Sequence, residues 1–574
     1  MAGLPETADV VVIGGGSAGA VIAARLSEWP GLRVVLVEAG PDTPPGQVPA
    51  DILDSYPGAA YFSGRYHWND LRVAYDSWAQ GDNRPPMIRR YEQARIMGGG
   101  SSINGMFAVR GLKSDYDSWA ASGATGWCFD DVLPYLKKLE RDTDFPDDPR
   151  HGSDGPIPIR RIPRQRWPGF TRALDEALAR RGHARLDDGN GTDDDGVFPF
   201  ALTNWPDQRV STAIAYMTPQ VRARQNLVLA DRSRLLDLVF DGRRVIGVRV
   251  ERDGTEQTIA ARRVVVSAGV FHSPPILLRA GIGPAAHLRE HGIPVLADRA
   301  GVGGGLQDHA SSALAFHLRR DARIDPAARR HIFAGVRYSS GHPDCPAGDM
   351  FLTIVNRAGW HPLGAAMGSV LLTVNRAFAD GGTVRLKSTD PRAEPDVTMR
   401  FFSDRRDLDR LISGYRMVAE LIADPEVAAT WNERFPSTYG EKARDLARKT
   451  FRTWWQTLVA ATLMDASATT RRFAMERLIH PPVTLEEVLA SDAALEAWTR
   501  ENAFSGWHAT GTCRMGAADN PLAVVDPATR VIGVEGLNVA DASIMPSIVC
   551  GNTNLTTIMI GEKTADLVAA DLAA

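Results

Sequence analysis

The chain has 574 residues, of which 44% are hydrophobic and 23% are charged, and its formal net charge is −4. This length allows two large domains or more, and the composition is that of a globular protein. The weakly acidic balance argues against nucleic acid or an anionic membrane surface as a partner, because both bind a concentrated basic surface.

Neither the N-terminus nor the cysteines indicate export or a metal site. The N-terminus lacks a charged segment followed by an apolar one, and no apolar run reaches the ~18 residues of a membrane helix. The four cysteines lie far apart and show no CxxC or Cys/His metal spacing. We therefore expect a cytoplasmic protein with reduced, buried thiols, no metal and no membrane segment.

The first predicted unit is a strand, a helix and a second strand within residues 9–40. A β-branched run covers 10–13, apolar residues at helical spacing cover 18–26, and a second apolar run covers 33–37. This βαβ order with a glycine-rich first turn is typical of dinucleotide-binding domains.

Glycines in that turn, and an acidic residue after the second strand, support the same prediction. Gly14, Gly16 and Gly19 let the backbone bend tightly, approach a pyrophosphate and pack the helix on the strand. Glu38 lies nineteen positions after Gly19, where a carboxylate can accept hydrogen bonds from an adenosine ribose. This unit alone leaves FAD and NAD open.

Two further stretches give weaker predictions. Residues 91–111, YEQARIMGGGSSINGMFAVRG, offer backbone and small polar donors to a cofactor, or form a plain glycine loop before a helix. The donors are Gly98, Gly99, Gly100, Ser101, Ser102 and Asn104. Two Asp-, Gly- and Pro-rich runs within 142–196 lack a calcium loop with its closing Glu, so we expect solvated loops there.

A second group of strands is predicted further along. Residues 227–259 indicate short antiparallel strands with hairpin turns at Asp241-Gly242 and Asp253-Gly254. Residues 263–283 then indicate a buried strand that ends at Ala268-Gly269 and returns to the cofactor sheet. The nucleotide-binding domain is therefore expected to be discontinuous in sequence.

Residues 311–500 alternate strand-like and helical runs. Helices are predicted over 406–422 and 441–460. The aromatic segment 451–478 contains Trp454, Trp455 and Met464, and we expect a core-packing helix there in preference to an aromatic helix that lines a pocket.

Candidate chemistry lies in the last part of the chain. FSGWHATGTCRMG places His508 among small residues, and a predicted strand over 536–540 leads to Asp541. Asn552 and Thr553 precede a helix whose N-terminus can face a cofactor. Taken alone, His508 is more typical of a structural histidine than of a catalyst.

Several ordered motifs together resemble the glucose-methanol-choline (GMC) oxidoreductases over nearly the whole chain. They are GGGSAG with EAG, ARIMGGGSSINGMFAVRG, AGVFHSPPILLRAGIG, GTVRLKSTDPRAEPDV, and WHATGTCRMG with VADASIMPSIVCGNTN. Within the family, YEQARIMGGGSSIN, HGSDGPIPI and GWHATGT are most similar to bacterial 5-hydroxymethylfurfural oxidases and related aryl-alcohol oxidases.

The resemblance implies an α/β protein that binds FAD in a glutathione-reductase-like Rossmann domain. A second, α+β domain of antiparallel sheet and helices would bind the substrate and cover the flavin ring. We assign residues 1–155, 205–310 and 500–574 to the FAD-binding domain, and 156–204 and 311–499 to the substrate-binding domain.

The resemblance makes His508 the active-site base and Asn552 its partner. A neutral imidazole with a pKa near ~6.5 suits removal of an alcohol proton, and an amide can donate a hydrogen bond to the developing alkoxide without titrating. The resemblance also implies a set of cofactor-binding residues: Gly14, Gly16, Ser17, Ala18, Gly19, Glu38, Ala39, Trp68, Met97, Gly98, Gly100, Ser101, Asn104, Gly105, Met106, Leu235, Ala268, Gly269, Trp507, Asp541, Ala542, Asn552 and Thr553.

Three positions depart from the patterns of relatives. Ile103 stands where some relatives attach the flavin through a histidine, so we expect dissociable FAD. Gly305 replaces the usual Asn of the GVGxNLxDH pattern, which here ends at Asp308-His309. Gly506 stands where oxidases often carry a small aliphatic residue beside the flavin carbon that meets dioxygen, which favours an oxidase.

The predicted activity is oxidation of primary alcohols, in particular aryl or heteroaryl hydroxymethyl groups, to aldehydes. Hydride would pass to flavin N5, and dioxygen would be the acceptor and give hydrogen peroxide. Alternatives left open are a dehydrogenase with a quinone-like acceptor, a redox-neutral hydroxynitrile lyase or fatty-acid photodecarboxylase of the same family, and a flavin-free NAD-dependent enzyme.

Overall fold

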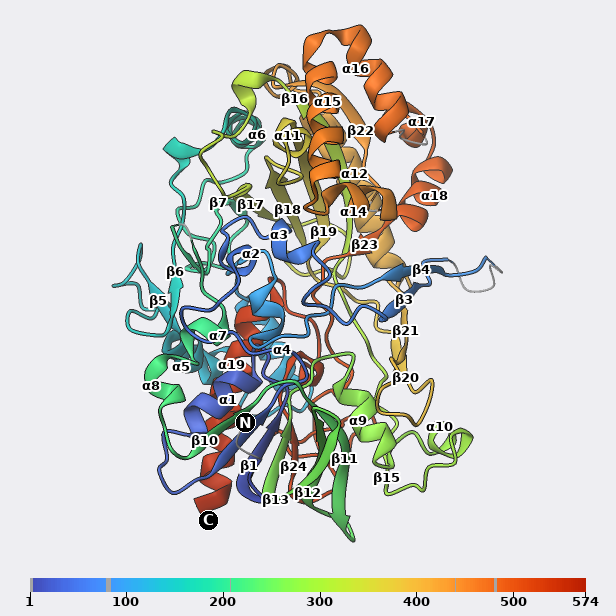
Figure 1. The fold of residues 1–574 in the computed structure, drawn as a ribbon. Helices are drawn as coiled ribbons and strands as arrows, with labels where there is room; N and C mark the ends of the chain where they lie inside the picture. The colour runs from blue at the N-terminus through green and yellow to red at the C-terminus, as the bar shows by residue number, and fades with distance from the viewer. Residues whose placement is uncertain (1–3, 79–83, 207, 439, 480–482, 574) are drawn as a thin grey trace.

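The computed structural model describes residues 4–78, 84–206, 208–438, 440–479 and 483–573. Two large sheets lie toward opposite ends of an elongated molecule, and both chain termini lie beside the first of them (Figure 1). A site that uses residues of both sheets must therefore lie between them.

The first sheet has seven strands in the order β10-β2-β1-β13-β12-β11, with β24 paired to β13. Their bounds are β1 Thr7–Ile13, β2 Val34–Val37, β10 Leu227–Ala230, β11 Ser233–Asp241, β12 Arg244–Arg252, β13 Thr255–Val266 and β24 Leu537–Val539. β1, β2 and β10 are parallel, and every residue of β2 is buried. Parallel strands covered on both faces need apolar residues at each position, which explains the continuous run VVLV. The predicted βαβ unit is confirmed.

β13 pairs with different strands along its length. It runs antiparallel to β12 from Thr255 to Ala260 and then parallel to β1 as far as Val266. The glycines of the two predicted hairpin turns have φ of +54° and +77°, a conformation that glycine adopts readily. The hairpins and the return to the cofactor sheet are confirmed. The antiparallel assignment of β10 is wrong, because a short apolar run does not reveal its partner and β10 joins β2 in parallel.

The second sheet is antiparallel, in the order β22-β16-β19-β18-β17-β7, with β23 paired to β16. Its strands are β7 Gly196–Pro199, β16 Ala310–Leu318, β17 Ile332–Tyr338, β18 Met350–Val355, β19 Met367–Val374, β22 Trp431–Pro436 and β23 Phe504–Ser505. The long helix α12 (Arg405–Ile422) packs against β19 and β16. The domain boundaries stay a prediction, and β23 joins this sheet although those boundaries place it in the FAD-binding part.

A helix from each end of the chain packs beside the first sheet (Figure 1). α1 (Gly19–Leu26) contacts α19 (Thr553–Ala573), where a Cβ on Gly561 would lie only 2.9 Å from the carbonyl oxygen of Ala18. Nε of Arg25 lies 2.8 Å from Oε2 of the fully buried Glu562. Close packing and a salt bridge thus fix α19 on α1, the helix that follows the glycine turn.

The acidic runs within 142–196 are not simply solvated loops, so that prediction is wrong in part. Asp142 is 1% exposed, and its Oδ2 lies 2.8 Å from Nη1 of Arg161. His151 joins Glu140 at 2.6 Å through Nδ1 and Asp188 at 2.8 Å through Nε2. Arginine and histidine side chains of the same stretch neutralise these carboxylates, and composition alone does not reveal such pairing.

The aromatic segment also differs from its prediction. It contains α15 (Phe451–Ala466), separate from α14 (Glu441–Ala447). Met464 is fully buried, but Trp454 and Trp455 are 36% and 48% exposed. α15 packs through its Ala460 and Met464 side, so core packing is wrong for the two tryptophans.

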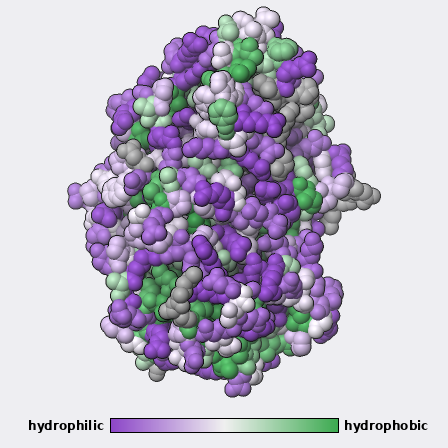
Figure 2. Space-filling model, viewed as in Figure 1, coloured by the Kyte–Doolittle hydropathy of each residue, from purple (hydrophilic) through white to green (hydrophobic). Residues whose placement is uncertain are grey.

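Polar residues cover most of the face in Figure 2, with small hydrophobic groups between them. Among the described helices, none is both long enough and apolar enough to cross a bilayer. All four cysteines are free, and two of them, Cys513 and Cys550, are buried. The cytoplasmic location stays a prediction.

Candidate active site

One cavity extends from the carboxyl ends of β1, β2 and β13 to the second sheet. Ile13, Val37 and Ser267 line its first part, and Thr353 and Thr373 line its last part. Ligands of open parallel sheets bind at the carboxyl ends of the strands, so the cavity lies where a dinucleotide would enter.

The glycine turn at the start of this cavity fits a dinucleotide. Gly14 has φ +98°, and a Cβ there would meet the carbonyl oxygen of Ser267 at 2.4 Å. At Gly16 the nearest atom to such a Cβ is 3.8 Å away, so the backbone is open toward the cavity. Glu38 accepts hydrogen bonds from the amides of Gly15 at 2.8 Å and Gly40 at 2.6 Å. Burial raises its pKa, and the carboxyl group borders the cavity, where a ribose would lie.

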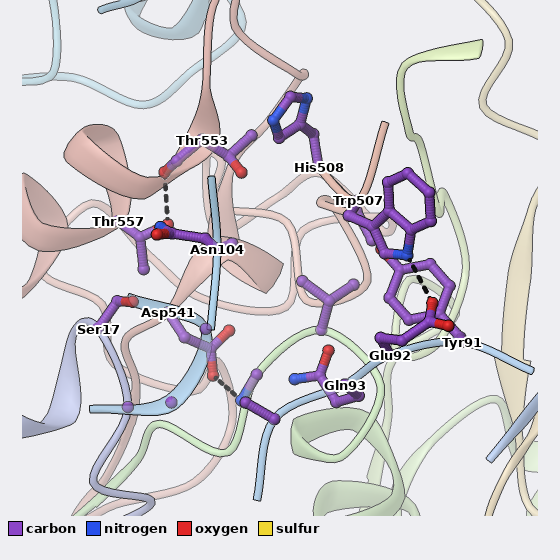
Figure 3. A pocket seen from close by; sticks show the side chains of 18 of the residues that line it. Ser17, Tyr91, Glu92, Gln93, Asn104, Trp507, His508, Asp541, Thr553 and Thr557 are labelled. Atoms are coloured by element: carbon purple, nitrogen blue, oxygen red, sulfur yellow. Dashed lines mark hydrogen bonds between the residues drawn. The ribbon is translucent and has the colours of Figure 1, made fainter. Parts of the chain in front are cut away.

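The last segment of the chain meets this turn directly. Ser17 donates to Oδ1 of Asn554 at 2.9 Å, so the N-terminus of α19 adjoins the first helix. Thr557 donates to the carbonyl oxygen of Thr553 at 2.7 Å, and Asp541 accepts from the amide of Gly269 at 2.9 Å (Figure 3). The first residues of α1 and α19 therefore border the same part of the cavity, and helix N-termini favour the binding of phosphate.

Most of the predicted residues line this cavity. They are Gly14, Gly16, Ser17, Ala18, Glu38, Ala39, Trp68, Gly100, Asn104, Gly105, Leu235, Ala268, Gly269, Trp507, His508, Asp541, Ala542, Asn552 and Thr553. Five others, Gly19, Met97, Gly98, Ser101 and Met106, are absent from its lining. They pack against the residues that line the cavity or against one another. For example, a Cβ on Gly19 would be 1.9 Å from the carbonyl oxygen of Gly14. Ser101 donates a hydrogen bond to the carbonyl oxygen of Gly98.

His508 and Asn552 meet at the wall between the two sheets. Nδ2 of Asn552 lies 3.0 Å from Nε2 of His508, and Nδ1 of His508 lies 2.9 Å from Nδ1 of His309. Burial lowers the pKa of His508 to about 4, so its imidazole is neutral at ordinary pH. The arrangement presents a neutral ring nitrogen and an amide at one point of the cavity.

A short turn holds His508 in place. Trp507 has φ +59°, which is uncommon for a bulky residue. Its backbone amide donates to Oγ of Ser505 at 2.8 Å, and its indole donates to Oε2 of Glu92 at 3.0 Å (Figure 3). Asp308 accepts from the backbone amide of His508 at 2.9 Å. Strain at a non-glycine residue that the surroundings enforce is typical of functional sites.

Four residues of this arrangement were not among the predicted site residues: Glu92, Asp308, His309 and Ser505. Asp308 and His309 close the GVGxNLxDH-like pattern, so that motif was the available signal. Burial raises the pKa of Asp308 to about 7. Glu92 and Ser505 also lie in quoted stretches, YEQARIMGGGSSIN and FSGWHATGTCRMG, but their individual roles arise only from contacts across the fold.

The part of the cavity next to the second sheet is mainly apolar and aromatic. Phe107 and Phe200 have ring centroids 4.7 Å apart, and Phe200 and Phe351 are 5.7 Å apart. Val109 and Ile332 complete this wall. Such a wall suits a flat, uncharged ring.

Sequence comparison identifies the family. Two family models, both described as GMC oxidoreductase, match residues 8–311 and 378–561. The chain belongs to the GMC oxidoreductase family. It is 42% identical over 566 residues to a 5-(hydroxymethyl)furfural oxidase of Methylovorus sp. (strain MP688), covering 98% of both chains. It is 34% identical to an oxygen-dependent choline dehydrogenase of Sinorhizobium medicae (strain WSM419), covering 97% of this chain and 95% of that one.

A solved structure agrees with this membership. The crystal structure of pyridoxine 4-oxidase from Mesorbium loti superposes with a TM-score of 0.80 at 25% identity, over 98% of this chain and 99% of that one. The protein is therefore an FAD-dependent alcohol oxidoreductase, and the α/β fold and the FAD expected from the sequence are confirmed. The glycine turn therefore binds FAD, and the NAD alternative that the sequence left open is wrong.

Proposed function

We propose that this enzyme oxidises a primary alcohol on an aromatic or heteroaromatic ring to the aldehyde, with His508 as base and dioxygen as electron acceptor. The observation that carries the proposal is the pair His508 Nε2 and Asn552 Nδ2, 3.0 Å apart, beside a wall of phenylalanine rings. Held by the glycine turn and the N-terminus of α19, FAD would supply the acceptor for the hydride of the alcohol carbon, and dioxygen would take up the two electrons and give hydrogen peroxide.

The chain's own residues move the proton. The hydroxyl proton of the alcohol goes to Nε2 of His508, which is neutral because burial lowers its pKa to about 4. The Asn552 amide donates a hydrogen bond to the oxygen as its negative charge develops. His508 then releases this proton, which with the hydride hydrogen accounts for the two hydrogens of hydrogen peroxide, so the base is neutral for the next turnover.

The wall distinguishes an aryl alcohol from choline, the substrate class named for a second group of relatives. A quaternary ammonium group is bound best by aromatic faces together with a carboxylate. The described strands of the second sheet line the cavity only with uncharged residues: Ser311, Ile332, Phe351, Thr353, Leu371, Thr373, Phe504 and Ser505. The Glu92 carboxylate also lines the cavity, but it is already paired with Arg444. A neutral ring therefore fits this wall better than a cation.

Two further observations support dissociable FAD and dioxygen. Ile103 borders the cavity with an aliphatic side chain, which has no nucleophile to bind a flavin covalently. Gly506 also borders the cavity, and a Cβ there would lie only 3.1 Å from Nδ1 of His508, so glycine keeps the contact around the base uncrowded. Dioxygen is instead supported by the 5-(hydroxymethyl)furfural oxidase among the relatives.

A substrate panel tests the proposal. The purified yellow enzyme is incubated in air with 5-hydroxymethylfurfural, benzyl alcohol, pyridoxine and choline, and peroxide and aldehyde are measured together. We expect peroxide and aldehyde in equal amounts from the ring alcohols and little from choline. Turnover that requires a quinone would instead indicate a dehydrogenase. Preference for choline would contradict the proposal that the phenylalanine wall binds an uncharged ring.

A further inference from the structure

The contact between the two histidines limits where their protons can be. Both Nδ1 atoms face each other at 2.9 Å, with the rings nearly perpendicular at 79°. One nitrogen must donate and the other must accept, because two lone pairs or two N–H groups at this distance repel. If His508 donates, its Nε2 is a free lone pair; if His309 donates, the proton of His508 lies on Nε2 and blocks the base.

The surroundings favour the first arrangement. The Asn552 amide nitrogen faces Nε2 of His508 at 3.0 Å, and an N–H donor requires a lone pair there. Burial lowers the pKa of His309, while the backbone carbonyls of Val549 and Asn375 act in the opposite direction. In this arrangement the N–H of His309 lies on Nε2, the ring nitrogen that does not face His508.

His309 is held rigidly enough to fix this contact. It is 1% exposed, its amide donates to Oδ1 of Asp308 at 2.7 Å, and its carbonyl oxygen accepts from the amide of Gly506 at 2.8 Å. β16 begins at the next residue. Nε2 of His309 has no hydrogen-bond partner of ordinary geometry among the described residues. A buried polar atom left in this way destabilises the fold, so the ring is not explained by stability alone.

We propose that His309 is a positioning residue that accepts the Nδ1 proton of His508 and so keeps Nε2 of His508 free to act as the base. The inference rests on the proposed function, because it assumes that His508 is the base. It assigns to His309 a task comparable to that of the carboxylate that orients the histidine of a catalytic triad. When His508 takes up the alcohol proton, the same contact holds the second N–H of the imidazolium.

Two substitutions separate this role from packing. His309→Leu keeps a similar volume but has no acceptor, whereas His309→Asn places a carbonyl oxygen at about the position of Nδ1. Each holoenzyme is mixed anaerobically with benzyl alcohol, and the rate of flavin reduction, the FAD content and the melting temperature are measured. We expect His309→Leu to reduce its flavin roughly 10- to 100-fold more slowly, and His309→Asn to recover most of the rate, with FAD bound in both.

The pH profile gives an independent readout. A tautomer ratio of a neutral imidazole does not depend on pH, so the His309→Leu defect should be the same factor from about pH 6 to about pH 9. Wild-type rates in His309→Leu, or equal losses in both variants at unchanged stability, would overturn the inference. If the wild-type flavin is not reduced by any alcohol, the proposed function fails instead, so the two failures are distinguishable.

Discussion

Trp507 donates its indole N–H to Oε2 of Glu92 at 3.0 Å, across a sequence separation of 415 residues. The hydroxyl of Tyr61 donates to the same oxygen at 2.9 Å, and Nη2 of Arg444 lies 2.9 Å from Oε1. This buried carboxylate therefore holds the residue that precedes the base, and it draws the long early segment into the C-terminal site.

Removal of this carboxylate should disturb the base without touching it. In Glu92→Ala the indole and the guanidinium lose a buried carboxylate partner, and breaking a buried ion pair typically costs about 3–5 kcal/mol. We expect a lower melting temperature and roughly tenfold slower flavin reduction, since small displacements of a catalytic group are costly. Glu92→Gln, which keeps the volume and one acceptor, is the matched control. Unchanged reduction in the alanine variant would show that Trp507 needs no such anchor.

Replacement of the base gives the largest effect. His508→Ala should keep its yellow FAD, because the glycine turn and α19 hold the cofactor, yet reduce it about 10²–10⁴-fold more slowly with benzyl alcohol. The half-buried His342, in the loop before β18, provides His342→Ala as a control that should behave as wild type. Near wild-type reduction in His508→Ala would remove this residue from the role of base.

The pH dependence of reduction follows from the pKa of His508. Burial lowers it to about 4, and the neutral form is the active base, so the rate should be flat around neutrality and fall only as the pH drops toward about 4. Stopped-flow reduction at saturating alcohol measures this profile. An apparent pKa near the ordinary histidine value of ~6.5 would contradict the buried, uncharged environment.

His151 makes stability depend on pH in the opposite range. Burial lowers its pKa, but hydrogen bonds to Asp188 and Glu140 outweigh this and raise it to about 9. A raised folded-state pKa contributes stability fully below the unfolded value of ~6.5, and that contribution is lost as the pH rises. The melting temperature should therefore decline between about pH 6.5 and about pH 9, and the decline should be smaller in His151→Gln. Parallel declines in both proteins would exclude His151 as the cause.

The sequence predicted the elements whose local pattern requires one structure. The continuous apolar runs of β1 and β2, the glycine turn, and the hairpins at Asp241-Gly242 and Asp253-Gly254 follow from backbone chemistry alone. The meeting of Ser17 with Asn554 could be expected from the resemblance but not from any local pattern. Most of the residues that line the cofactor region could therefore be predicted from local patterns and the resemblance.

The remaining features depend on contacts between distant segments. Nothing local separates the buried Asp142 from its exposed neighbours, because Arg161 neutralises it only in the folded chain. Trp454 and Trp455 are apolar enough for a core, yet α15 buries its opposite side. The anchor role of Glu92 likewise exists only because Trp507, Tyr61 and Arg444 converge on it.

The most direct test is anaerobic mixing of the holoenzyme with 5-hydroxymethylfurfural, followed by admission of air. We predict rapid loss of the oxidised flavin absorbance with one aldehyde formed per flavin, and then full recovery of the absorbance with release of peroxide. If 5-hydroxymethylfurfural, benzyl alcohol and pyridoxine all leave the flavin oxidised, His508 and Asn552 do not form the alcohol-oxidising pair described above.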